Sequence, residues 1–121
     1  MTNSSHTVLV VEDDPFVRAE AVELFRDLGC RVLDSYNAEG ALALLDQNPV
    51  IDILFADVRM PGMDGLTLAQ QVRRRRPDMM LVLTSAYTPP IALEPPMTFL
   101  PKPWRKPDLA ALLEWRRDAG E

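Results

Sequence analysis

The chain has 121 residues, and its 13 basic and 18 acidic side chains give a formal net charge of −5. This length holds one domain with one core, and a composition of 47% hydrophobic and 26% charged residues is typical of a globular protein and excludes wholesale disorder. The acidic balance argues against nonspecific nucleic-acid binding, no stretch approaches the roughly 18 apolar residues of a membrane span, and a single cysteine excludes an internal disulfide.

Short apolar runs and helical patterns alternate along the chain. Runs without alternating polar residues indicate strands buried on both faces of a parallel sheet, and apolar residues three and four apart indicate helices that pack on it. In chain order the pattern predicts a strand at 8–11, a helix between Pro15 and Gly29, a weaker strand at 31–36, a helix capped by Asn37 and ended by Asn48, a strand at 51–56, a helix from Leu66 that Pro77 stops, a strand at 79–83, a weaker strand at 98–100, and a last helix entered through Pro107.

This alternation predicts one open, doubly wound α/β domain over residues 1–121. Residues 1–6 are expected to be disordered and residues 118–121 to be frayed. The first seven residues lack the basic and apolar regions of a signal peptide, so we expect a cytoplasmic protein. The four consecutive arginines at 73–76 are interpreted as a solvated helix end that the helix dipole favours, with a docking patch for an acidic partner as the alternative.

Polar side chains stand where the predicted strands end, and open parallel sheets form their sites at the carboxyl ends of the strands. The first strand is followed by Glu12 and Asp13, the third by Asp57 and the fourth by Ser85, and the fifth leads to Lys102. Clustered carboxylates repel one another unless a cation lies among them. Three carboxylates, one lysine and one Mg²⁺ balance to zero formal charge, and Mg²⁺ leaves a place for a phosphate oxygen. The pattern therefore indicates a site for a phosphoryl group.

Four segments carry these residues: VVEDDP at 10–15, ADVRMPGMDG at 56–65, TSA at 84–86 and KP at 102–103. Together they resemble the receiver domain of two-component response regulators, and the resemblance covers essentially the whole chain. It implies a flavodoxin-like, five-stranded parallel sheet of order 2-1-3-4-5. It also implies a phosphoprotein of phosphorelay signalling that is not an enzyme, since it would catalyse only its own phosphorylation and dephosphorylation.

The resemblance assigns the phosphoacceptor and the metal ligands. Asp57 would take a phosphoryl group from the phosphohistidine of a histidine kinase or a histidine phosphotransfer protein. Asp13 would bind Mg²⁺ (or Mn²⁺) directly, and Glu12 would act mostly through a metal-bound water. Asp57 itself and the backbone carbonyl of Arg59 would complete the metal ligands, and Asp14 is left outside the set.

Other positions would respond to the phosphoryl group or tune its lifetime. Ser85 and Lys102 would contact the group, and the peptide bond between Lys102 and the following proline would be cis. The pull on Ser85 would be coupled to Phe99, the aromatic of the fifth strand, as a switch. Arg59 and Tyr87 would flank the attacking water, and because both are bulky we expect restrained dephosphorylation.

The segment at 88–97 departs from the family pattern. It holds four prolines in ten residues where relatives carry their fourth helix, and an interior proline costs about 3 kcal/mol. We therefore expect this helix to be reduced or absent, with at most one turn at 91–94. The segment is also expected to be the least protected part of the chain and, with the last helix, to form the switched binding surface.

We expect a stand-alone receiver that switches a surface for an unknown downstream protein, with no direct role for nucleic acid or membrane. The alternatives are a phosphate sink, a phosphorylation-independent docking module, a Mg²⁺-dependent phosphatase and a flavodoxin-like cofactor binder. The phosphatase is disfavoured because Arg59 stands where such enzymes place a second acid, two residues after the nucleophile. The cofactor binder is disfavoured by the carboxylate cluster, and the docking module by the presence of every expected site residue.

Overall fold

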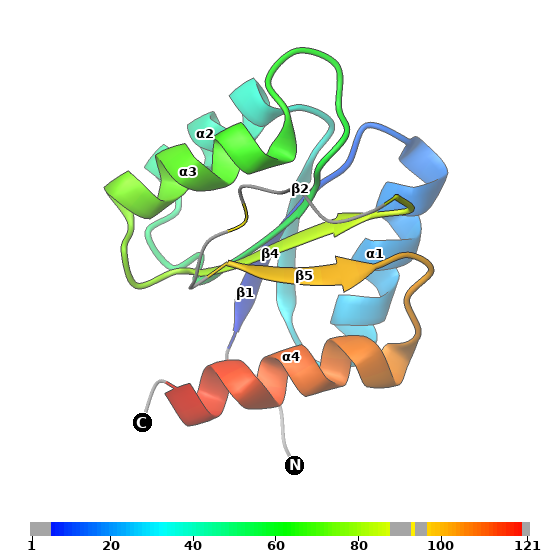
Figure 1. Ribbon diagram of the computed structural model, residues 1–121. Coiled ribbons are helices and arrows are strands. Elements are labelled where there is room, and N and C mark those ends of the chain that lie inside the picture. Colours follow the sequence, from blue (N-terminus) through cyan, green and yellow to red (C-terminus); the bar gives the residue numbers. More distant parts are fainter. Residues whose placement is uncertain (1–5, 88–92, 94–96, 120–121) are drawn as a thin grey trace.

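A computed structural model describes residues 6–87, 93 and 97–119 of the chain, and Figure 1 shows how their helices and strands are arranged. The five strands form one parallel sheet of order β2-β1-β3-β4-β5, which confirms the predicted doubly wound, flavodoxin-like fold. The elements are β1 (Thr7–Val11), α1 (Pro15–Asp27), β2 (Arg31–Ser35), α2 (Ala38–Gln47), β3 (Ile53–Asp57), α3 (Gly65–Arg75), β4 (Met80–Ser85), β5 (Thr98–Pro101) and α4 (Lys106–Ala119).

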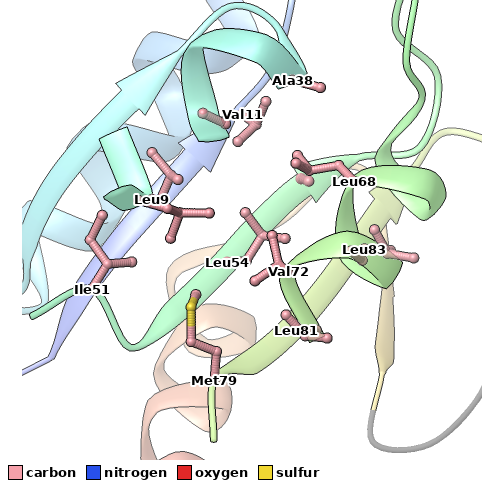
Figure 2. Packing of buried hydrophobic residues seen from close by; sticks show 14 of the residues in the cluster. Leu9, Val11, Ala38, Ile51, Leu54, Leu68, Val72, Met79, Leu81 and Leu83 are labelled. Carbon is pink, nitrogen blue, oxygen red and sulfur yellow. The ribbon is translucent and has the colours of Figure 1, made fainter. Parts of the chain in front are cut away.

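Both faces of the sheet are covered by helices, which explains why the central strands are unbroken apolar runs. Along β1, Leu9 and Val11 pack under α2 and α3, whereas Val8 and Val10 pack against α1 and α4 on the opposite face. Figure 2 shows the first of these cores, in which side chains of the strands meet Leu68 and Val72 of α3. Because all five residues of β1 are buried, the strand is held rigidly on both sides.

The loops that follow β1 and β3 are fixed by helix caps. Asp14 is the N-cap of α1, and its carboxylate accepts hydrogen bonds from the backbone N–H groups of Phe16 and Val17 at 2.9 and 3.3 Å. Asp64 caps α3 in the same way through the N–H of Thr67, at 2.8 Å. The cap of α1 fixes the backbone just ahead of the helix, where Glu12 and Asp13 lie at the edge of the sheet.

Contrary to the interpretation from the sequence, the arginines at the end of α3 are not all solvated. Arg73, Arg74 and Arg75 lie in the last turn as expected, but the half-buried guanidinium of Arg76 does not simply face water. It donates to the backbone carbonyl of Leu45 in α2. At 3.0–3.4 Å it also donates to three carbonyls of the loop between α2 and β3, those of Asn48, Pro49 and Ile51. Interpreting Arg76 as solvated was therefore wrong, because its guanidinium donates to carbonyls at the end of α2 and in the loop that follows it.

The connection between β4 and β5 confirms the predicted reduction of the fourth helix, since no helix is present there among the residues that the structure describes. Beyond Tyr87, the described residues of this connection are Leu93 and Met97, and both pack against the core on the α2–α3 face. The turn proposed at 91–94 falls outside the described residues except for Leu93. The expected disorder of residues 1–6 and fraying of 118–121 stay predictions, although His6 pairs with Asp52 at 2.9 Å and α4 runs to Ala119.

Candidate functional site

The carboxyl ends of four parallel strands bring the predicted polar residues to one edge of the sheet. Asp57 is the last residue of β3 and Ser85 the last of β4, while Glu12 directly follows β1 and Lys102 directly follows β5. One carboxylate oxygen from each of Glu12, Asp13 and Asp57 lies within 4.8 Å of the others. The strand order therefore creates an acidic cluster from residues that are far apart in the sequence.

Both the side chain and the backbone of Glu12 are hydrogen-bonded. Its side chain is buried, and its two carboxylate oxygens accept hydrogen bonds from Lys102 Nζ at 2.9 Å and from the N–H of Asp14 at 3.1 Å. Its own N–H donates to the carbonyl of Ser35, and its carbonyl accepts from the guanidinium of Arg18, at 3.1 and 2.9 Å. The carboxylate of Glu12 is thus fixed in place, with both oxygens already engaged.

Asp57 and Asp13 differ in their surroundings. Asp57 is buried, and its two oxygens accept from Lys102 Nζ at 3.1 Å and from the N–H of Arg59 at 3.3 Å. Asp13 is exposed, and no hydrogen bond to its carboxylate is present in the described part of the chain. Asp13 is therefore the acid of the cluster with the most freedom to bind an ion from solvent.

The charges of the site shift two pKa values. Burial raises the pKa of Glu12 above its usual value, and the charge of Asp57 adds to this, while the hydrogen bond from Lys102 opposes it. Burial alone would lower the pKa of Lys102, but the hydrogen bonds and charges of Glu12 and Asp57 outweigh it and raise that pKa. Lys102 is therefore a firmly protonated cation between two buried carboxylates.

The donor set suits a hard divalent cation. Three carboxylates in one cluster are the oxygen ligands that Mg²⁺ prefers, and one lysine neutralises only part of their charge. The exposed position of Asp13 leaves a route from solvent. The residues present therefore fit Mg²⁺.

Comparison with known proteins decides the family. Residues 8–114 match the family model of the response regulator receiver domain. The chain belongs to the response regulator receiver domain family. Receiver domains are signalling domains of two-component systems that bind Mg²⁺ at an acidic pocket and interact with histidine kinases and phosphotransfer proteins.

Individual relatives agree with this assignment. The chain is 31% identical over 118 residues to the sensor kinase CckA of Brucella abortus, covering 93% of this chain and 12% of that protein. It is 37% identical over 114 residues to the positive alginate biosynthesis regulatory protein of Pseudomonas aeruginosa, covering 88% of this chain and 45% of that protein. The crystal structure of the receiver domain of the hybrid histidine kinase CckA superposes with a TM-score of 0.80 at 36% identity, covering 91% of this chain and 97% of that one. The receiver thus spans less than half the length of these two curated relatives.

The two residues expected to form the switch are placed differently. Ser85 is buried, and its hydroxyl oxygen accepts the N–H of Tyr87 at 3.0 Å. Phe99 is half-buried on β5, opposite Leu83 in the strand register, and packs against the core under α2 and α3. Ser85 therefore lies at the site, whereas the Phe99 side chain packs β5 against the core under α2 and α3.

The two residues expected to tune the chemistry contact each other. The guanidinium carbon of Arg59 lies 4.1 Å from the ring centroid of Tyr87, a cation–π arrangement between the loop after β3 and the loop after β4. Both side chains are exposed, so the stacked pair lies at the surface of the receiver. This contact joins the loops that follow Asp57 and Ser85.

Two contributors to the site were not assigned a role from the sequence. A Cβ at Gly65 would overlap the backbone carbonyl of Asp57, so only glycine lets α3 start this close to Asp57. The indole N–H of Trp104 donates to the hydroxyl of Thr84 at 2.7 Å in the interior. The glycine could be suspected from its place in the MDG segment, whereas no local pattern pairs Thr84 with Trp104.

The Lys102–Pro103 peptide bond is cis, as the resemblance implied, and the Lys102 N–H donates to the carbonyl of Ser85 at 2.9 Å. This hydrogen bond continues the pairing of β4 with β5 by one residue beyond Pro101.

Among the described residues, no helix of the receiver is long and apolar enough to cross a membrane.

Proposed function

We propose that this receiver accepts a phosphoryl group on Asp57 from the phosphohistidine of a histidine kinase or phosphotransfer protein, and that the phosphorylated form presents a changed surface to a downstream protein. The observation that carries the proposal is the buried carboxylate of Asp57 at the end of β3, 3.1 Å from the ammonium of Lys102 and within 4.8 Å of two further carboxylates. A carboxylate next to a fixed cation is a nucleophile suited to accept a phosphoryl group.

The transfer itself is an in-line displacement. A carboxylate oxygen of Asp57 forms a bond to phosphorus while the bond from phosphorus to the imidazole nitrogen breaks, and the bonding electron pair leaves with the imidazole. Such a step needs positioning and charge neutralisation more than covalent help. The ammonium of Lys102 lies next to the reacting carboxylate and favours the negative charge that arrives with the phosphoryl group.

The acidic cluster would hold Mg²⁺ or Mn²⁺ through Asp13, Asp57 and the backbone carbonyl of Arg59. Bound there, the cation supplies neutralisation of phosphoryl oxygen charge. Glu12 would act through a metal-bound water, since both of its oxygens already accept hydrogen bonds within the protein. This division of roles follows from the burial of Glu12 and the exposure of Asp13.

The signal would leave the site through Ser85. The phosphoryl group carries about −1.5 to −2 charges where the carboxylate carried one, and its strong acceptor oxygens attract a nearby hydroxyl. The Ser85 hydroxyl would donate a hydrogen bond to such an oxygen, while its own oxygen still accepts the N–H of Tyr87. Movement of this loop would be passed to β5 and Phe99 and would alter the surface that a partner reads. The stacked pair of Arg59 and Tyr87 would slow the approach of water to the acyl phosphate.

Phosphoryl uptake is tested with phosphoramidate and Mg²⁺, followed by intact-mass measurement. We expect one acid-stable, base-labile phosphate on the unsubstituted protein and none on Asp57→Asn, which keeps the side-chain volume. Asp46→Asn, which alters an exposed aspartate paired with Arg75 at 3.2 Å, is the matched control and should be phosphorylated normally. Stoichiometric phosphate on the Asp57→Asn variant would overturn the assignment.

The metal ligands are tested separately by calorimetric titration with Mg²⁺. Asp13→Ala should weaken binding more than Glu12→Ala, because Glu12 is proposed to act only through water. Equal losses in the two variants would contradict this ranking. Turnover of unrelated phosphoesters in the same preparation would favour a phosphatase, and partner binding that is unchanged by phosphorylation would favour a docking module.

A further inference from the structure

A buried polar contact lies directly behind the site. Trp104, two residues after Lys102, is 5% exposed, and its indole N–H donates to the hydroxyl of Thr84, which is 1% exposed, at 2.7 Å. The indole also packs edge-to-face on Phe55 of β3, with ring centroids 5.2 Å apart. A phenylalanine could fill this space without needing an acceptor, whereas a buried N–H is costly unless it is paired. The hydrogen bond to Thr84 therefore fixes the orientation of the Trp104 indole, which packing alone would not do.

Thr84 connects this contact to the acceptor strand. It pairs in register with Asp57 on β3, and its backbone carbonyl accepts the N–H of Val58 at 2.9 Å. The next residue, Ser85, accepts the N–H of Lys102 through its carbonyl at 2.9 Å. Backbone bonds from β4 thus hold the residue after the acceptor on one side and the lysine on the other.

The loop that carries Lys102 has few other anchors. It leaves β5, a four-residue edge strand whose residues are half-buried or exposed. The Lys102 side chain still reaches Glu12 at 2.9 Å and Asp57 at 3.1 Å, and its ammonium lies 5.9 Å from the centroid of the Trp104 ring. A long, flexible lysine stem needs a fixed starting point to hold such a geometry.

We propose that Trp104, anchored by the Thr84 hydroxyl, is a positioning residue that holds Lys102 against Asp57 for phosphoryl transfer. Trp104 acts through Lys102 and does not touch the phosphoryl group. The inference rests on the proposed function, because it concerns the rate at which Asp57 is phosphorylated. A positioning role differs from a purely structural one in a measurable way: its effect on the rate requires Lys102 to be present.

The test compares Thr84→Val, which removes the acceptor oxygen at nearly constant shape, with Thr84→Ser, which keeps it. Phosphorylation by phosphoramidate at saturating Mg²⁺ should be about tenfold slower in Thr84→Val, since small misplacements of a catalytic group have effects of this size or larger. The rate of Thr84→Ser should stay within about twofold of the unsubstituted protein. Mg²⁺ affinity by calorimetry should be the same in all three proteins, because Thr84 and Trp104 are outside the proposed metal ligands.

The decisive measurement is the same substitution in a Lys102→Ala background. We expect Thr84→Val to have no further effect on the rate there, and an equal slowing in both backgrounds would overturn the proposal. If thermal unfolding shows that Thr84→Val does not fold, Trp104→Phe, which keeps an aromatic ring but has no N–H, replaces it with the same expectations. Unchanged rates in a folded variant also overturn the proposal. Failure of the unsubstituted protein to take up phosphate would instead overturn the proposed function, and this inference with it.

Discussion

Lys102 should stabilise the folded receiver as well as serve its chemistry, and Lys102→Met tests this. The substitution keeps the length of the aliphatic stem but removes the ammonium that lies 2.9 Å from Glu12 and 3.1 Å from Asp57. Both carboxylates have less than a tenth of their side-chain surface exposed, so they would face each other in the interior without a protein cation. We expect the free energy of unfolding to fall clearly in the absence of divalent cations.

The size of the effect follows from burial. At about 3 Å and an effective dielectric constant of about 20, each charge pair has a gross attraction of roughly 5 kcal/mol, most of which offsets the desolvation of the charges. Removing one partner of a buried pair typically costs about 3–5 kcal/mol. Lys102 keeps 18% of its side chain exposed, which favours the lower end, about 3 kcal/mol. Since small domains have about 5–15 kcal/mol of stability, the variant should still fold.

Urea unfolding in EDTA and in excess Mg²⁺ gives the comparison. A bound divalent cation should replace much of the missing charge, so the difference between wild type and Lys102→Met should shrink from about 3 to about 1–2 kcal/mol when Mg²⁺ is added. Lys106→Met is the matched control, because Lys106 pairs with Asp27 at 3.8 Å and both side chains are about half exposed. Its effect should stay below about 1 kcal/mol, with or without Mg²⁺. Equal stability of Lys102→Met and wild type in EDTA, or a difference that Mg²⁺ leaves unchanged, would refute the reasoning.

Three further outcomes are expected. Gly65→Ala should lower the free energy of unfolding by about 1–3 kcal/mol and slow phosphorylation, because the new Cβ would displace the backbone of Asp57. Gly62→Ala is the control: Gly62 has a φ of +77° and open space around it, so the substitution should lower stability but leave the phosphorylation rate unchanged. Arg76→Met should cost about 2 kcal/mol in urea unfolding, because four carbonyls lose the hydrogen bond from the guanidinium. The exposed Arg74→Met should cost less than about 0.5 kcal/mol. Because the folded-state pKa of Lys102 is raised above 10.5, its stabilisation should be complete below pH 10.5 and be lost as the pH rises through the higher value. Above pH 10.5, stability measured by urea unfolding should therefore fall more steeply in wild type than in Lys102→Met.

The central strands of the sheet could be predicted from the sequence because both of their faces are buried. Unbroken apolar runs mark β1, β3 and β4 to within two residues. The start of β3 differs by two residues: the buried Ile51 lies ahead of the strand because its N–H donates to the carbonyl of Asn48 in a turn. Burial places a residue in the core without deciding whether its backbone joins the sheet. The edge strands β2 and β5, which are only partly buried, left a weaker pattern.

The residues brought together at the site could be predicted because they stand directly at strand ends. The contacts that hold them could not, since they depend on long-range packing. A buried indole such as that of Trp104 needs an acceptor, but nothing near it in the sequence points to Thr84, 20 positions away. The four carbonyls that Arg76 reaches are backbone atoms, which carry no sequence signal of their own. Only the folded chain reveals these partners.

The strand order also has a consequence for synthesis of the chain. Glu12 and Lys102 are 90 positions apart, and their hydrogen bond exists only once β5 has joined the sheet. A ribosome releases Glu12, Asp13 and Asp57 well before it releases Lys102, so an emerging chain carries the acids without their cation. Under the proposed function, phosphoryl uptake should therefore begin only once β5 is in place and Lys102 lies beside Asp57.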